Sequence, residues 1–459
     1  MSNRVFDASR MLIAALISLT CSVGLAAPHS DGELRIEVVD RATGQPIAAR
    51  MHLKTLAGRP VKLRLPGTAE FGGHFYIDGK LTLPLHVGRY TFELEAGPEY
   101  LKDSGHFEIE RHADDSKRIE MKRVVDLSAE GWWGGDVDVR RSARDRPLIL
   151  RAEGLKIAPL SDPKAAKNIS PKLEIDGHFI ARSPYAWDLP VWLASGKLEA
   201  IELINHHSLR GGVVDNENDG RPRDKSFFPG ALGNGRWSEA VYYHVLNCGL
   251  RIPPVAGSGS GSNDNPVGTN RAYVFCGTEF SKNAWWAGLR AGRVFVTNGP
   301  LLRPLVEGHP PGYVFQITAG ESINLEIGLN LATSVPVEYL QIVKNGVVDA
   351  EVRLADWKNR AGRLPPAHFD DSGWFLVRAV TNNPKVYQFA SSGPYYVYKA
   401  DRPRVSRKSV RFFLDWINAA ETRIRSFRSL DDAQRAAMLA KQESARSFFE
   451  KLLASANAD

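Results

Sequence analysis

The stretch Ala200-Ile201-Glu202-Leu203-Ile204-Asn205-His206-His207 reads as an apolar strand that is followed directly by polar side chains. This pattern of an apolar strand with a polar end determines the fold. Three further stretches between residues 135 and 261 repeat it and end at residues 140, 162 and 261. In α/β folds the carboxyl ends of parallel strands meet at one edge, where ligands and catalytic groups collect. The pattern therefore predicts an α/β region with one polar mouth.

Working outward from this region, the 459 residues suggest about three domains, because domains typically contain ~100–200 residues. Residues 1–27 read as a signal peptide, since Arg4 and Arg10 precede an apolar run at 11–19 and small residues follow as far as Ala27. That run is too short to span a bilayer, so we expect no membrane insertion. The sequence predicts a secreted or periplasmic protein.

The net charge of +7 falls to +6 when residues 1–27 are removed, and a basic protein of this kind favours anionic partners. The basic residues are dispersed and do not alternate with aromatic residues along a stripe, which argues against nucleic-acid binding. Two cysteines then remain, Cys248 and Cys276, and their sequence context leaves open whether they pair.

Residues 32–124 alternate apolar and polar positions between turn signals, which predicts a small β-sandwich. The stretches 43–47 (TGQPI) and 88–91 (GRYT) resemble the hairpin and late strand of a carboxypeptidase-regulatory-like module. Modules of that type serve as spacers or binding platforms, so this resemblance implies no catalytic role for the segment.

Residues 126–304 alternate strands with helices predicted at 145–154, 238–248 and 283–291, which is typical of an α/β domain with largely parallel strands. Residues 312–399 return to strands and predict a second sandwich-like domain with a hairpin turn at Asn345-Gly346. Residues 405–457 predict a helical hairpin, with Ser429 as the cap of its second helix and an aromatic stripe packed on another domain.

Four stretches carry a resemblance to a known family: DLPVWLASG at 188–196, GRWSE at 235–239, LNCGLR at 246–251 and GLRAGRVFVTNGP at 288–300. On these, the central region resembles the CehA/McbA branch of the PHP-type metallohydrolases. The resemblance implies a distorted α/β barrel that hydrolyses esters through a small metal cluster. The expected fold is therefore α/β and β multidomain, with a β-sandwich, a PHP-like barrel, and a second β-sandwich-like domain closed by the helical hairpin.

The chain departs from this family at the metal ligands. The expected His-x-His pair is replaced by Asp138 and Arg140, and the expected Thr-Asp-His reads Ser161-Asp162-Pro163. The expected Ser-Asp-Ser-His is replaced by a glycine-rich turn that contains Gly259, whereas the expected glutamate is present. A cluster that needs several imidazoles and a bridging carboxylate cannot be built from glycine, proline and arginine.

Two hypotheses follow. In one, Asp138, Asp162 and Glu202 hold a single divalent metal ion, and His206 or His207 supplies a ligand or the general base. This would be an active hydrolase of esters or phosphoesters with a reduced, oxygen-rich site.

In the other hypothesis, which we favour, no metal binds and Arg140 supplies the missing positive charge, because a guanidinium is always charged and can bind two carboxylates. The pocket then belongs to a catalytically silent protein. Arg140, Arg210 and the turn around Gly259 would hold an anionic or glycan ligand, a small molecule and not a nucleic acid.

Overall fold

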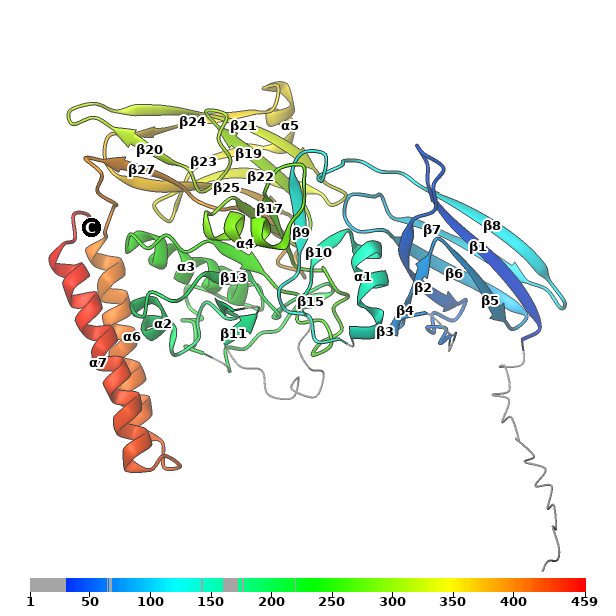
Figure 1. The fold of residues 1–459 in the computed structure, drawn as a ribbon, viewed down its shortest axis with the longest axis horizontal. Coiled ribbons are helices and arrows are strands. Elements are labelled where there is room, and N and C mark those ends of the chain that lie inside the picture. Colours follow the sequence, from blue (N-terminus) through cyan, green and yellow to red (C-terminus); the bar gives the residue numbers. More distant parts are fainter. Residues whose placement is uncertain are drawn as a thin grey trace, which may run out of the picture.

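The computed structural model describes residues 30–63, 65, 68–141, 143–159, 172–175, 177–218 and 220–459. The predicted signal peptide and the predicted metal ligand Asp162 lie outside these residues. Figure 1 shows the N-terminal sheet at one end of the molecule and the C-terminal helices at the other. The mixed central region lies between them, with a second β region above it.

The N-terminal region is one eight-stranded sheet in the order β7-β6-β2-β4-β5-β1-β8, with β3 paired to β4. β1 and β8 are parallel, and alternate residues of β1 such as Leu34, Ile36 and Val38 enter the core, as the alternation predicts. Its strands are β1 (Gly32–Asp40), β2 (Ala48–Thr55), β3 (Glu70–Phe71), β4 (His74–Asp78), β5 (Lys80–Leu85), β6 (Gly88–Glu95), β7 (Asp103–Ile109) and β8 (Asp114–Met121).

The central region mixes parallel and antiparallel strands, so the expectation of largely parallel strands is only partly met. β9–β10, β12–β13 and β13–β16 are parallel, whereas β17 is antiparallel to both β9 and β18. The strands are β9 (Trp132–Gly135), β10 (Leu155–Ile157), β11 (Lys172–Ile175), β12 (His178–Ala181), β13 (Ala200–Ile204), β14 (Ser208–Leu209), β15 (Gly212–Val213), β16 (Pro254–Ala256), β17 (Arg271–Phe275) and β18 (Val294–Thr297).

Three helices of this region match the predicted segments, whereas the helix at Leu189–Ala194 was not predicted. Gly154 ends the first in the left-handed conformation at φ 64°, and Ser281 caps the last by accepting a hydrogen bond from the Ala284 amide at 3.1 Å. The helix predicted at 238–248 begins at Gly233, several residues earlier than expected. The helices are η1 (Ala143–Asp145), α1 (Arg146–Glu153), α2 (Leu189–Ala194), α3 (Gly233–Asn247) and α4 (Lys282–Arg290).

One sheet joins the central region to the second β region. Its main path runs β10-β9-β17-β18-β26-β25-β22-β23, so strands on both sides of the predicted boundary at 304–312 pair directly. β18 meets β26 at Phe295↔Ser392, Val296↔Ser391 and Thr297↔Ala390. The boundary read from composition therefore falls inside a hydrogen-bonded sheet.

The second β region packs this sheet against a three-stranded sheet, β19-β21-β24, around a shared apolar core. Asn345 and Gly346 both have positive φ and turn β22 into β23, as predicted. The elements are β19 (Leu301–Val306), β20 (Val314–Ile317), β21 (Ile323–Ala332), β22 (Val337–Lys344), β23 (Val347–Arg353), α5 (Leu354–Asn359), β24 (Arg363–Phe369), β25 (Gly373–Thr381), β26 (Phe389–Ser392) and β27 (Tyr395–Lys399).

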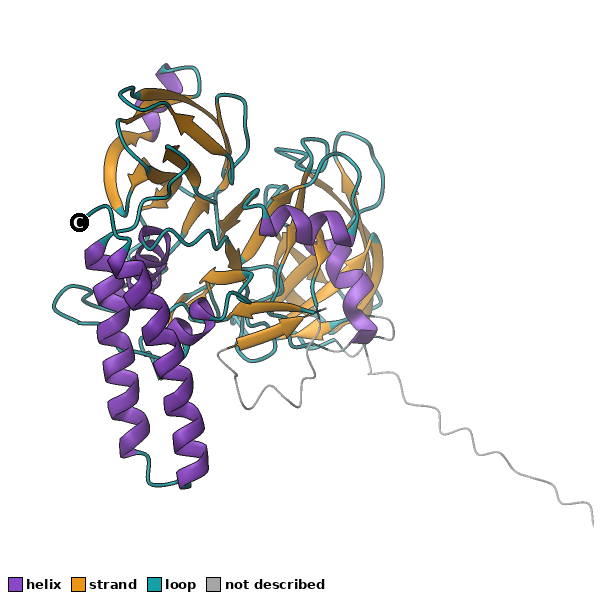
Figure 2. Ribbon diagram, turned by 60° about the vertical axis from the view of Figure 1, so that its left-hand side comes forward, coloured by secondary structure: helices purple, strands orange, loops and turns teal. Residues whose placement is uncertain are grey.

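The chain ends in two long antiparallel helices, α6 (Arg407–Ser426) and α7 (Asp432–Ala454), which lie side by side in Figure 2. Phe413 and Trp416 are fully buried, because the aromatic stripe of α6 packs against the central region. The prediction of Ser429 as the second cap is wrong. Asp431 is the cap, and it forms a capping box with Gln434.

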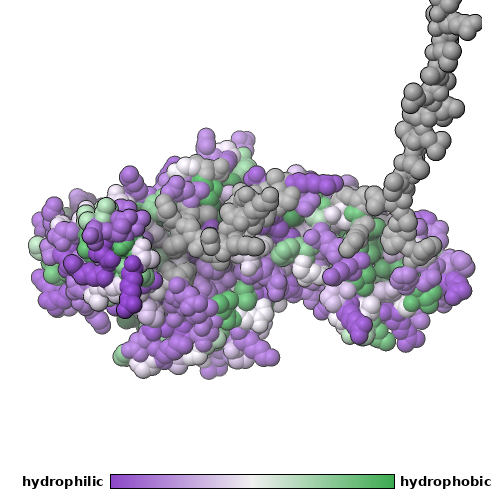
Figure 3. Space-filling view, turned by 90° about the horizontal axis from the view of Figure 1, so that it is seen from below, coloured by the Kyte–Doolittle hydropathy of each residue, from purple (hydrophilic) through white to green (hydrophobic). Residues whose placement is uncertain are grey.

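No helix of the described residues is long and apolar enough to cross a membrane. In the view of Figure 3 the described surface is mainly hydrophilic, with apolar residues in separate small areas.

Candidate functional site

The candidate site is a buried cluster of ionisable side chains where the central strands end. Residues 136–140 continue β9 beside the glycine-rich turn that follows β16. Val139 pairs with Ser260, and the Arg140 amide donates to the Ser260 carbonyl at 2.7 Å. This pairing places the polar residues of two strand ends next to each other, as the sequence pattern predicts.

Asp138 is the centre of the cluster. Arg140 Nε lies 3.2 Å from its Oδ1, and Arg182 Nε lies 3.0 Å from its Oδ2. All three side chains are buried. The carboxylate therefore carries a guanidinium on each oxygen, and Arg182 is a site residue that the sequence analysis missed.

Glu202 and His206 complete the cluster. One ligand atom from each, with one from Asp138, all lie within 4.8 Å of one another. Neither Glu202 carboxyl oxygen nor His206 Nδ1 has a hydrogen-bond partner among the described residues. Burial, with Asp138 nearby, raises the Glu202 pKa well above its usual value, and burial, with His207 nearby, lowers the His206 pKa. Both shifts favour the uncharged forms.

A second buried carboxyl lies beside the cluster. Asp136 accepts hydrogen bonds from the Ser258 amide at 3.0 Å and from the Gly268 amide at 2.7 Å, and also from the Ser258 hydroxyl. Burial raises the pKa of Asp136 to about 7, although these hydrogen bonds oppose the shift. At neutral pH Asp136 is therefore only partly ionised, and it contributes less than a full negative charge.

The two adjacent histidines have different partners. His206 faces Asp138 and Glu202, whereas His207 Nδ1 lies 2.6 Å from the hydroxyl of Tyr185. The two rings still lie 4.2 Å apart. Of the two predicted catalytic residues, only His206 therefore belongs to the cluster, and Tyr185 is a further neighbour that the sequence did not indicate.

The predicted ligand-binding residues Arg210 and Gly259 have different surroundings. Arg210 forms ion pairs with Glu93 and Glu95 of the N-terminal sheet, away from Asp138. Its guanidinium therefore joins two regions of the fold and is not directed at the cluster.

Gly259 has φ 63°, and a Cβ added there would lie 2.6 Å from the His206 Cβ. The amides on either side of Gly259 are used within the protein: Ser258 donates to Asp136, and Ser260 donates to the Ser258 hydroxyl. The turn thus makes room for His206, and these two amides are not available to an anion.

Three asparagine amides hold the two strand-end loops together, and sequence reasoning did not find them. Asn270 Nδ2 donates to the carbonyls of Asn205 at 2.9 Å, Ser208 at 3.1 Å and Gly257 at 3.0 Å. Asn263 and Asn265 make similar bonds to the same loops. The carbonyl groups of these irregular loops are therefore satisfied although they are buried.

The cluster does not fit the metal centre that the family resemblance implies. Asp138, the central carboxylate, is bound on both oxygens by guanidinium groups that stay positively charged, and these oppose a divalent cation. Among the described residues His206 is the one imidazole of the set. Within the described part of this cluster, Glu202 and His206 are the residues that present open donor atoms.

Comparisons with known proteins do not identify a family. No family model and no curated protein matches the chain. Two solved structures show limited similarity. The TIE protein of Bacillus anthracis has 20% identity and a TM-score of 0.17, covering 25% of this chain and 20% of that one. The β-glucuronidase of Parabacteroides merdae has 9% identity and a TM-score of 0.18, covering 79% of this chain and 62% of that one. These scores are too low to support an argument about fold or activity.

Proposed function

We propose that this chain is an exported relative of the PHP-type, CehA/McbA-like metallohydrolases that has a degenerate metal site and binds an anionic or glycan ligand without hydrolysing it. The observation that carries the proposal is the double ion pair of Asp138 with Arg140 and Arg182. Two guanidinium groups bind the Asp138 carboxylate, which would otherwise be free to bind a catalytic metal ion.

The charges of the cluster support this proposal. Arg140 and Arg182 are permanently charged, whereas burial favours the neutral forms of Glu202 and His206. The cluster is therefore stable without a cation, because its acids do not all need to ionise together. The surplus positive charge favours an anionic ligand over a cationic one.

An active metal-dependent hydrolase is the second candidate, and the open donor atoms of Glu202 and His206 favour it. In that case Asp138, Glu202 and His206 would hold one ion, which would supply the Lewis acid and activate water. The guanidiniums on Asp138 would then have to tolerate a divalent cation a few ångströms away.

Elemental analysis separates the two candidates. The mature protein is purified without chelator or a metal-affinity tag, then incubated with Zn²⁺, Mn²⁺ or Mg²⁺ and desalted. We expect far less than one ion per chain. Retention of about one ion per chain, lost in Glu202→Gln, would overturn the proposal and justify a screen for ester and phosphoester hydrolysis. Glu199→Gln is the matched control, because Glu199 pairs with His178 outside the cluster.

A further inference from the structure

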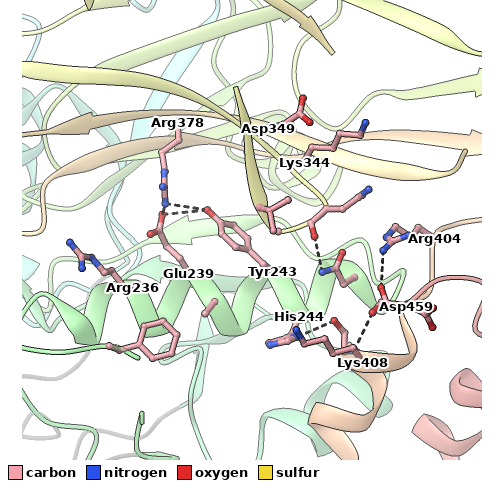
Figure 4. A pocket seen from close by; sticks show the side chains of 18 of the residues that line it. Arg236, Glu239, Tyr243, His244, Lys344, Asp349, Arg378, Arg404, Lys408 and Asp459 are labelled. Atoms are coloured by element: carbon pink, nitrogen blue, oxygen red, sulfur yellow. Dashed lines mark hydrogen bonds and ion pairs between the residues drawn. The ribbon is translucent and has the colours of Figure 1, made fainter. Parts of the chain in front are cut away.

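A large pocket lies away from the strand-end cluster, where three parts of the fold meet. It has a volume of about 740 Å³ and lies between α3, the β22–β23 turn and the start of α6 (Figure 4). Small-molecule sites in proteins typically measure roughly 300–1,000 Å³ and often lie between domains. The pocket is therefore large enough for a ligand of several linked rings.

One face of α3 forms the floor of this pocket. Arg236, Ala240, Tyr243, His244 and Asn247 all line it, and they recur at the three- and four-residue spacing that places side chains on one side of a helix. Asn247 lies eleven positions after Arg236, so the floor is about 16 Å long at 1.5 Å per residue. The pocket is elongated along the helix.

The basic groups lie at the two ends of this floor. Figure 4 shows Arg236 on one side of Glu239 and Tyr243, and Arg404 with Lys408 on the opposite side. Arg236 and Lys408 are exposed, and within the described residues neither forms an ion pair. Arg404 donates to the Asp459 carbonyl at 3.1 Å, but its buried Nε has no hydrogen-bond partner among the described residues.

The middle of the pocket is uncharged or internally neutralised, apart from Lys344, which lines it from β22 and whose ammonium donates to the His368 carbonyl at 2.5 Å. Arg378 donates a hydrogen bond of 2.7 Å to Glu239. Glu239 also accepts a hydrogen bond from the Tyr387 hydroxyl. The ion pair of Arg378 and Glu239 therefore forms a wall of the pocket with no net charge. Burial, together with Lys408, lowers the pKa of His244 to about 4, so its ring is neutral at pH 7. Tyr243 adds an aromatic ring between the two ends.

Two exposed acids, Asp349 and Asp459, restrict the charge pattern of any ligand. The Asp459 carboxylate lies 3.9 Å from Arg407 and offsets part of the positive charge at the end that carries Arg404 and Lys408. Asp349 lines the pocket from β23, is exposed, and forms no ion pair within the described part of the chain. It would repel a molecule that is negatively charged along its whole length. The pocket therefore favours negative charges at the ends of a ligand and hydroxyl-rich, neutral groups between them.

We propose that this pocket binds a short acidic oligosaccharide whose end carboxylates meet Arg236 on one side and Lys408 with Arg404 on the other. Carboxylates bind guanidinium and ammonium groups through charge-assisted hydrogen bonds. The uncharged part of the sugar would lie over Tyr243, because aromatic rings pack against apolar faces while leaving polar groups free. The site is independent of whether the strand-end cluster holds a metal.

The test uses the full mature protein and isothermal titration calorimetry with trigalacturonate in 20 mM salt. We expect binding that weakens at least about tenfold in 0.5 M NaCl, because surface charges are then screened. Arg236→Ala and Lys408→Ala should each weaken binding about tenfold, which corresponds to ~1.4 kcal/mol. Lys408→Arg should restore most of the affinity, and Lys451→Ala on the exposed face of α7 should leave it unchanged.

Two comparison ligands make the result decisive. Maltotriose has the same number of sugar units without carboxylates, and equal binding of maltotriose would overturn the proposal. Inorganic phosphate tests for a single-anion site, and phosphate binding that depends on Lys408 and not on Arg236 would also overturn it. Absence of trigalacturonate binding at 1 mM would do the same. None of these results bears on the metal content of the strand-end cluster, so the two proposals fail separately.

Discussion

Arg182 and Asp138 form a buried ion pair, with Arg182 Nε 3.0 Å from Asp138 Oδ2, although 44 residues separate them in the sequence. Arg182 directly follows β12, and Asp138 follows β9. The pair joins two strand ends that belong to different sheets. Together with Arg140 it gives one carboxylate two guanidinium partners.

Replacement of Arg140 tests the charge balance of the cluster. Arg140→Ala leaves Asp138 with Arg182 alone, and loss of one partner from a buried ion pair typically costs about 3 kcal/mol. We expect a decrease of that size in the free energy of unfolding, measured in urea. Arg35→Ala breaks an exposed pair with Asp114 and should cost less than about 1 kcal/mol.

Arg140→His adds an imidazole at the position where the family resemblance implies one. We expect lower stability in this variant too, because a neutral imidazole does not replace the guanidinium charge. If Arg140→His leaves both stability and ligand binding unchanged, the guanidinium does not serve in place of a metal.

Asp136 predicts a pH-dependent contribution to stability. Its pKa is about 7 in the folded protein and about 3.8 when unfolded, so its contribution is fully present below pH 3.8 and is lost as the pH rises through 7. The difference is on the order of 4 kcal/mol. Asp136→Asn cannot titrate. The free energy of unfolding of Asp136→Asn should therefore fall below that of the natural protein by more at pH 5 than at pH 8. Urea unfolding at both pH values measures this difference. A deficit independent of pH would show that Asp136 does not titrate in this range.

Gly259 tests whether the glycine-rich turn positions His206. Gly259→Ala introduces a Cβ 2.6 Å from the His206 Cβ, whereas Gly277→Ala, also at positive φ, meets nothing within 4 Å. Both pay the left-handed backbone penalty of about 1–2 kcal/mol. Only Gly259→Ala adds overpacking, typically ~1–3 kcal/mol. We expect the Tm of Gly259→Ala to fall further than that of Gly277→Ala, and equal losses would contradict this role.

Replacement of Arg210 tests how strongly the N-terminal sheet is held to the central region. Its guanidinium contacts Glu93 and Glu95, and the same acids lie 3.6 and 3.1 Å from the more exposed Lys102 ammonium. Arg210→Ala should cost about 2 kcal/mol, and Lys102→Ala less than about 1 kcal/mol. Hydrogen exchange should speed up in β2 and β6 in the first variant. Unchanged exchange there would mean that other contacts hold the two regions together.

Local features of the fold could be predicted from the sequence. The Asn345-Gly346 turn and the helical segments that become α1 and α4 were predicted, because each depends on a few neighbouring residues. The cap of α7 was predicted at Ser429, two residues before the actual cap, Asp431. Such a shift of two residues is typical of helix boundaries.

The candidate site was only partly predictable. Asp138, Arg140 and His206 follow recognisable strand ends, Glu202 lies within β13, and these residues meet as the pattern predicts. Arg182 follows the short strand His178–Ala181 in the same way, and this signal was present but not used. Arg210 was misassigned, because only the docking of the N-terminal sheet shows where its guanidinium lies. Contacts of this kind depend on pairing over long sequence separations, which local patterns do not encode.

The strand pairing between β18 and β26 also determines which fragments of this protein can exist. A chain truncated near residue 304 would lack β26, so β18 would become an exposed edge strand. Its unpaired N–H and C=O groups could then pair with a strand of another molecule. Such a piece is expected to self-associate, even though composition suggests an independent domain. Residues 126–399 should instead melt as one cooperative block, and any truncation or domain exchange in this protein should keep that block whole.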